Sequence, residues 1–123
     1  MKIEHCAIWV RDIERTRQFF GTFFHTKASD RYDNDKGFSS YFLSFADSDT
    51  RIEIMQSPYV PIEIIPATSH IALSIGTEQA VDELTRQLVA AGHKLLNGPR
   101  VTGDGYYESC LCIFGEFILE LTI

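Results

Sequence analysis

The sequence predicts an α+β protein made of two tandem modules, each with the element order βαβββ. The first observation is a pair of similar strand-like runs, each followed by a helix-like run: KIEHCAIWV at 2–10 and SHIALSI at 69–75. The second is that about three more strand-like runs follow each helix. The third is a length of 123 residues with 45% hydrophobic residues, which is typical of one globular domain. We therefore expect a single domain over 1–123.

The elements of the first module follow from its local patterns. A strand is predicted over 3–10, where Ile, Val and Trp are frequent. Asp12 can cap a helix over 13–24, whose apolar residues recur at helical spacing. The segment TKASDRYD at 26–33 is a poor strand candidate. Two further strands complete a module of about 1–57, over 37–45 and 50–56.

The second module repeats this order after a linker at about 58–66, where prolines predict exposed chain. Within this module, about 67–123, a strand is predicted over 68–75. Thr77 can cap a helix over 78–92 that ends at a glycine. The remaining elements are a short strand at 93–97, a loop at 98–105 and two strands at 106–114 and 116–123.

Charge and hydropathy exclude several classes of partner. A net charge of −6 argues against nucleic-acid binding, which needs a basic surface. No apolar run is long enough to cross a bilayer, so no membrane partner is expected. The first residues, MKIEHC, lack the apolar stretch of a signal peptide. We expect a cytoplasmic protein with a small-molecule substrate.

Ionisable residues occur at matching places in the two modules. Side chains alternate between the faces of a strand. In three of the four strands concerned, and nearly so in the strand at 3–10, an aliphatic row opposes a row that holds one His or Glu. The four residues are His5, Glu53, His70 and Glu120, with separations of 48 and 50 positions within the modules. The duplication therefore predicts one His and one Glu at equivalent positions of each module.

These four side chains suit a divalent metal ion. A carboxylate among aliphatic residues is costly to bury without a partner. Two neutral imidazoles and two carboxylates neutralise one divalent cation, and zinc, nickel, cobalt, iron or manganese would fit the set. The alternative is that the histidines are ordinary core or surface residues and that the glutamates line a solvated sheet face.

Three stretches carry a resemblance to a known family: IEHCAIWVRDIERTRQFF at 3–20, SHIALSI and FILELTI at 117–123. They resemble the vicinal oxygen chelate superfamily, which includes glyoxalase I, methylmalonyl-CoA epimerase, fosfomycin-resistance proteins and extradiol dioxygenases. The resemblance implies a cup-shaped, mostly antiparallel sheet with a metal site on its concave face. It also implies a homodimer with sites at the subunit interface. The ligands it implies are His5, Glu53, His70 and Glu120.

The resemblance further implies a metal-dependent lyase or isomerase of the glyoxalase I, or lactoylglutathione lyase, type. Such enzymes chelate two vicinal oxygens of a small oxo compound or its thiol adduct and stabilise an enediolate. A glutamate then moves a proton between adjacent carbons. Glu53 and Glu120 are the candidates, and Glu120 is favoured. Glutamate at position 53 is closer to glyoxalase I than to the epimerase or the fosfomycin enzymes, where Gln and His are expected.

Substrate contacts are sought on the metal face and in the adjoining loops. Six residues are the candidates: Trp9, Arg11, Arg51, Met55, Arg100 and Tyr106. The loop PRVTGDGYYES at 99–109 resembles that of small glyoxalase-like proteins of unassigned substrate, and no basic residues match those that hold glutathione. The alternatives are an epimerase or extradiol-type dioxygenase on the same scaffold, and a non-catalytic small-molecule binding or resistance protein.

Overall fold

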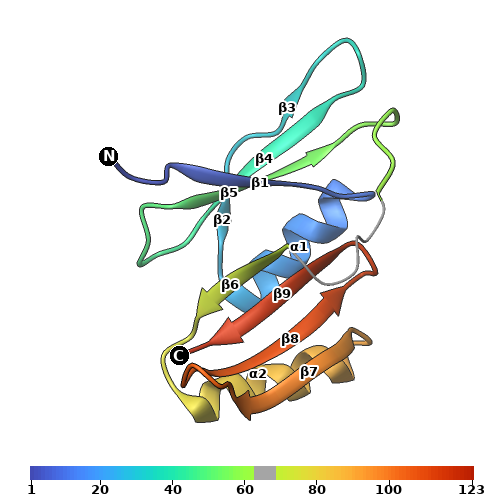
Figure 1. Ribbon diagram of the computed structural model, residues 1–123. Coiled ribbons are helices and arrows are strands. Elements are labelled where there is room, and N and C mark those ends of the chain that lie inside the picture. Colours follow the sequence, from blue (N-terminus) through green and yellow to red (C-terminus); the bar gives the residue numbers. More distant parts are fainter. Residues whose placement is uncertain (63–68) are drawn as a thin grey trace. The chain divides into compact units, whose positions relative to one another are not determined.

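The protein is described by a computed structural model that covers residues 1–62 and 69–123. The chain divides into two compact units, Met1–Ile62 (unit 1) and Glu63–Ile123 (unit 2). Each unit contains one mixed sheet and one long helix (Figure 1). The predicted α+β class with two βαβββ modules is confirmed. The predicted linker lies in part at 63–66, outside the described residues.

Unit 1 forms a sheet in the order β1-β5-β4-β2, with β3 paired to β4. The strand β1 runs parallel to β5, and the other pairs are antiparallel. The segment 26–33, a poor strand candidate by its sequence, forms two short strands that pair with β4. The elements are β1 (His5–Trp9), α1 (Ile13–Phe24), β2 (Lys27–Ala28), β3 (Tyr32–Asp33), β4 (Ser39–Ser44) and β5 (Arg51–Gln56).

The core of unit 1 lies between α1 and its sheet. Asp12 caps the helix, as predicted, because its carboxylate accepts a hydrogen bond from the Arg15 backbone N–H at 2.9 Å. The helix buries Ile13 and Phe20, and β5 buries Ile52 and Ile54. Alternation along β5 therefore leaves the residues between and beside these isoleucines on the opposite face.

Unit 2 repeats the arrangement with the order β6-β9-β8-β7, and β6 is parallel to β9. The helix α2 packs on β7, β8 and β9, where it buries Val81 and Leu88. Among the described residues, no helix has the length and apolar character needed to cross a membrane. The elements are β6 (His70–Ser74), α2 (Glu78–Ala90), β7 (Lys94–Val101), β8 (Tyr107–Ile113) and β9 (Phe117–Thr122).

The prediction of a loop at 98–105 is wrong for its first half, because β7 continues to Val101. Gly98 allows this continuation. It has a φ of +79°, and a Cβ there would lie 2.4 Å from the backbone oxygen of Glu108 on β8. The ladder shifts register on both sides of Asn97 instead of ending. Close backbone approach at a glycine therefore holds the second half of β7 against β8.

Candidate metal centre

In unit 1, parallel pairing of β1 and β5 brings the first predicted His and Glu together. Their side chains lie on the face opposite the buried isoleucines, and Glu53 is aligned with Ala7, two residues beyond His5. His5 Nε2 lies 3.8 Å from Glu53 Oε2. The Glu53 side chain is only 16% exposed, so its carboxylate is largely removed from water.

Neighbouring side chains fix the His5 ring. Its Nδ1 contacts the Glu4 carboxylate, and its ring packs edge-on against Phe42 at 5.3 Å between centroids. Hydrogen bonds from His5 and then from Arg51 lower the pKa of the Glu4 carboxyl, so it accepts as a carboxylate. When Nδ1–H donates to Glu4, the Nε2 lone pair faces Glu53 and is available to a metal.

Unit 2 reproduces the pair at the same register. The strands β6 and β9 are parallel, and Glu120 is aligned with Ala72, two residues beyond His70. His70 Nε2 lies 3.1 Å from Glu120 Oε2. The Glu120 side chain is 15% exposed. Each unit thus places one imidazole nitrogen beside one half-buried carboxylate.

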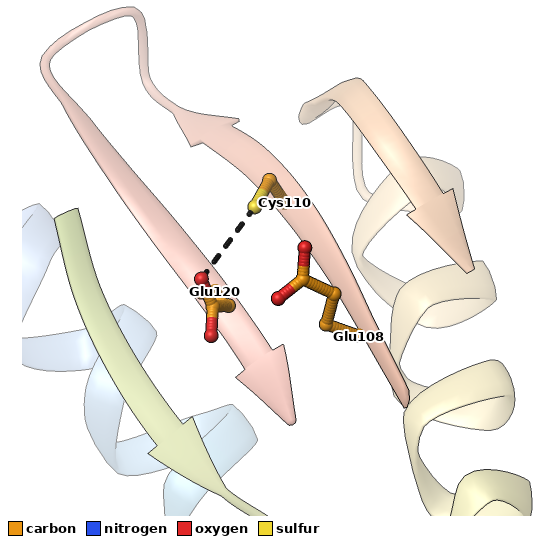
Figure 2. Close-up of side chains that lie close together, drawn as sticks. All are labelled: Glu108, Cys110 and Glu120. Atoms are coloured by element: carbon orange, nitrogen blue, oxygen red, sulfur yellow. Dashed lines mark hydrogen bonds between the residues drawn. The ribbon is translucent and has the colours of Figure 1, made fainter. Parts of the chain in front are cut away.

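Two further side chains accompany Glu120 on the face of the β8–β9 ladder. Figure 2 shows Glu108 and Cys110 beside it, with the Cys110 thiol directed at the Glu120 carboxylate. Cys110 Sγ lies 4.0 Å from Glu120 Oε2, and one ligand atom of each of the three residues lies within 4.8 Å of the others. Arg100 Nη2 lies 3.4 Å from Glu108 Oε1. Neither Glu108 nor Cys110 is among the site residues predicted from the sequence.

The electrostatic environment of this face favours a cation. Burial raises the pKa of Glu120, and the negative charge of Glu108 raises it further, while His70 acts in the opposite direction. Burial also raises the pKa of the Cys110 thiol, with the charge of Glu120 as the next cause. Burial and neighbouring negative charge thus act together on these groups, with His70 and Arg100 as the nearby opposing groups.

The donor chemistry of both pairs fits a divalent metal. In each, an imidazole nitrogen lies beside a carboxylate with little exposure, and imidazole nitrogen and carboxylate oxygen are ligands of zinc and its neighbours in the transition series. The structure brings His5 together with Glu53, and His70 together with Glu120, each within its own unit.

Three predicted substrate contacts lie on the His5–Glu53 face of unit 1. Trp9 is aligned with Met55 across the β1–β5 ladder and packs edge-on against Phe38 at 5.9 Å. Arg51 lies over the Phe42 ring at 4.3 Å and pairs with Glu4. These side chains surround the pair with aromatic and apolar surface and one guanidinium.

The other three predicted contacts lie in different places. Arg100 reaches the Glu120 face of unit 2 through its ion pair with Glu108. Tyr106 lies in the turn between β7 and β8, where its backbone N–H bonds Thr102 Oγ1, and it is 53% exposed. Arg11 follows β1, and its guanidinium donates to the backbone oxygen of Ile62 at 2.6 Å.

The sequence model of the Glyoxalase/Bleomycin resistance protein/Dioxygenase superfamily matches residues 2–117 of the chain. Among curated proteins, none matches the sequence.

Solved structures with the same fold cover almost the whole chain. A possible glyoxalase from Bacillus cereus has a TM-score of 0.73 at 20% identity, covering 100% of this chain and 99% of its own. The trypanothione-dependent glyoxalase I of Leishmania major has a TM-score of 0.79 at 18% identity, and the match covers 99% of this chain and 86% of the Leishmania chain. A third structure is a mutant of the fosfomycin resistance protein FosX from Listeria monocytogenes, complexed with Mn(II) and 1S,2S-dihydroxypropylphosphonic acid. It has a TM-score of 0.75 at 22% identity, and the match covers 98% of this chain and 90% of the FosX chain. At these identities the likeness establishes the fold.

Proposed function

The chain belongs to the Glyoxalase/Bleomycin resistance protein/Dioxygenase superfamily, and from this premise we propose that it is a metal-dependent lyase or isomerase of the glyoxalase I type. Its substrate is a small oxo compound or the adduct of one with a thiol. The observation that carries the proposal is the duplicated His–Glu pair, which recurs at the same register in both units and pairs imidazole with carboxylate each time.

Both pairs together would hold one divalent ion, with His5 and His70 as nitrogen ligands and Glu53 and Glu120 as oxygen ligands. Zinc, nickel, cobalt, iron and manganese all accept this donor set. When bound, the ion supplies Lewis-acid polarisation of two neighbouring substrate oxygens. Two carboxylates balance its charge, so the pairs need no lysine or arginine. The two pairs come either from one chain or from the two chains of a homodimer.

The protein's own residues then move the proton. We assign this role to Glu120, whose carboxylate takes a proton from one substrate carbon and returns it to the neighbouring one. Glu120 is favoured over Glu53 because Cys110 and Glu108 lie beside it and would offer other donor atoms to an ion while Glu120 moves the proton. In unit 1 the position opposite Glu53 is occupied by Phe42, which offers no such donor atom.

The surrounding side chains bind and orient the substrate. Trp9 and Met55 supply apolar walls that exclude water from the reacting atoms. Arg51 and Arg100 supply positive charge for an anionic part of the substrate, with Arg11 and Tyr106 as outer contacts. The guanidinium of Arg51 already lies on the same face as His5 and Glu53, which supports this role.

The test is a metal analysis combined with an activity screen. The purified protein is loaded with each candidate metal and assayed with methylglyoxal plus glutathione or another thiol. We expect metal-dependent isomerisation with at least one thiol, and its loss together with bound metal in His5→Ala and His70→Ala. Full activity after complete metal removal would overturn the proposal.

A second candidate is another activity of the superfamily: an epimerase, an extradiol-type dioxygenase, or a non-catalytic small-molecule binding or resistance protein. The likeness to FosX, whose structure holds Mn(II) and a dihydroxypropylphosphonic acid, favours keeping this candidate. Oxygen consumption with an iron-loaded protein and a catechol would select the dioxygenase. Metal-independent binding of fosfomycin without turnover would select the binding protein.

A further inference from the structure

The two units differ at the position directly opposite the predicted glutamate ligand. In unit 1, Phe42 on β4 is aligned with Glu53 on β5. In unit 2, Cys110 on β8 is aligned with Glu120 on β9. The duplicated fold thus places an aromatic ring beside one glutamate and a thiol beside the other. A phenylalanine ring cannot donate to a transition-metal ion as a thiolate does.

The position two residues earlier on β4 and on β8 also differs between the units, and again only unit 2 has a possible metal donor there that carries a charge. Ser40 stands two residues before Phe42, and Glu108 stands two residues before Cys110. Residues two apart on a strand share a face, so Glu108 and Cys110 project together toward Glu120 (Figure 2). On β8, unit 2 therefore adds one carboxylate and one thiol beside its His–Glu pair, whereas the matching positions on β4 of unit 1 hold Ser40 and Phe42.

Two carboxylates lie close together on this face and have little exposure. Glu108 and Glu120 are each only 15% exposed. Arg100 pairs with Glu108 through one oxygen at 3.4 Å, and His70 contacts Glu120 at 3.1 Å. Among the described residues, two carboxylates and a thiol share this half-buried face with the Arg100 guanidinium and the His70 imidazole. Carboxylate oxygen and thiolate sulfur are donors that divalent transition-metal ions accept.

We propose that Cys110 is a further metal ligand, donated by unit 2 to the ion that His70 and Glu120 hold, with Glu108 as its supporting carboxylate. This inference rests on the proposed function for the presence of the ion. Binding forms a metal–sulfur bond and releases the thiol proton to solvent, so no electron is gained or lost. A sulfur ligand makes the site prefer zinc or cobalt over manganese and magnesium.

Cobalt(II) is the probe, because its bond to a thiolate gives a charge-transfer absorption in the near ultraviolet that nitrogen and oxygen ligands do not give. Metal-free protein is titrated with cobalt chloride while absorbance is recorded. We expect this band in the wild type and in Cys6→Ser, whose thiol is exposed on β1. We expect Cys110→Ser to lack the band and to bind cobalt about tenfold or more weakly.

Alkylation of the unmutated protein provides a measurement that no folding defect of a variant can affect. With zinc present, modification of Cys110 by iodoacetamide should slow at least about tenfold, while modification of Cys6 should not change. Cobalt bound by the wild type without the band overturns the inference and leaves the proposed function standing. A band that persists in Cys110→Ser also overturns it. If no cobalt binds at all, the inference and the proposed function both fail.

Discussion

At the scale of single residues, the central feature is a carboxylate held beside an imidazole on two neighbouring parallel strands. Glu53 and Glu120 each lie two register positions beyond their histidine, and both have little exposure. Removing one charge while keeping the shape tests whether these carboxylates act as ligands. Gln retains an oxygen but is a much weaker donor to a divalent cation.

We expect Glu53→Gln and Glu120→Gln each to weaken zinc binding by at least about tenfold, because even outer partners of metal ligands account for roughly 10–100-fold. Isothermal titration of the metal-free protein measures this. Glu83→Gln is the matched control, since Glu83 lies on the exposed side of α2 and pairs with Arg86. Equal affinities in all three variants would contradict the assignment of these glutamates.

The predicted site residues follow a pattern along the sequence, whereas the residues that were missed depend on how two strands pair. His5, Glu53, His70 and Glu120 stand out because alternation separates them from aliphatic neighbours, and duplication repeats them. Glu108 and Cys110 join Glu120 through the register of the β8–β9 hairpin and the directions of side chains. Neither is visible from spacing alone, because a shift of one residue would move both to the opposite face.

At the scale of elements, Gly98 holds β7 against the strand that carries Glu108. We expect Gly98→Ala to destabilise the protein by about 2–4 kcal/mol, because a Cβ there meets the Glu108 backbone oxygen and the positive φ disfavours alanine. Urea unfolding measures this. Gly103→Ala is the control, since nothing lies within 4 Å of a Cβ at that position. Equal stability of the two variants would show that β7 does not need the close approach.

A polar network ties α1 to β4 and should make unit 1 sensitive to acid. The Tyr41 hydroxyl donates to Glu14 Oε1 at 2.7 Å, and this bond, followed by that from Arg17, lowers the pKa of Glu14 below 4.5. A carboxyl with a lowered folded pKa stabilises the fold fully above its unfolded value. That contribution is lost as the pH falls through the lower, folded pKa.

We therefore expect the stability difference between the wild type and Glu14→Gln to be constant above about pH 5.5 and to shrink as the pH falls below about 4.5. Urea unfolding across this range, with Trp9 fluorescence as the signal, measures the difference. Tyr41→Phe removes the largest cause of the shift and should move the transition to higher pH. A difference that stayed the same at every pH would contradict the role of this network.

Sequence patterns predicted the long strands and both helices because each carries a strong apolar period and, for the helices, a capping residue. The short strands β2 and β3 were not predicted, because a strand of two residues is too short to show an alternation of apolar and polar side chains. The extension of β7 was missed because Gly and Pro at 98–99 are typical of loops. There the tertiary contact with β8 overrides the local signal.

At the scale of the whole molecule, bound metal should stabilise the folded chain. An ion that binds only the native state adds about 2.7 kcal/mol when its free concentration is 100 times the dissociation constant. We expect thermal unfolding of the zinc-loaded protein to occur at higher temperature than that of the chelated protein. This increase should be much smaller in a variant that combines His5→Ala with His70→Ala. An equal increase in that variant would place the ion elsewhere.

The proposal depends most on the two His–Glu pairs sharing one ion, and metal stoichiometry tests this directly. Elemental analysis and zinc titration are compared for the wild type, His5→Ala and His70→Ala. We expect one tightly bound ion per chain in the wild type, and a strongly reduced affinity for that ion in either variant. Two ions per chain in the wild type, with each variant losing only one of them, would contradict it.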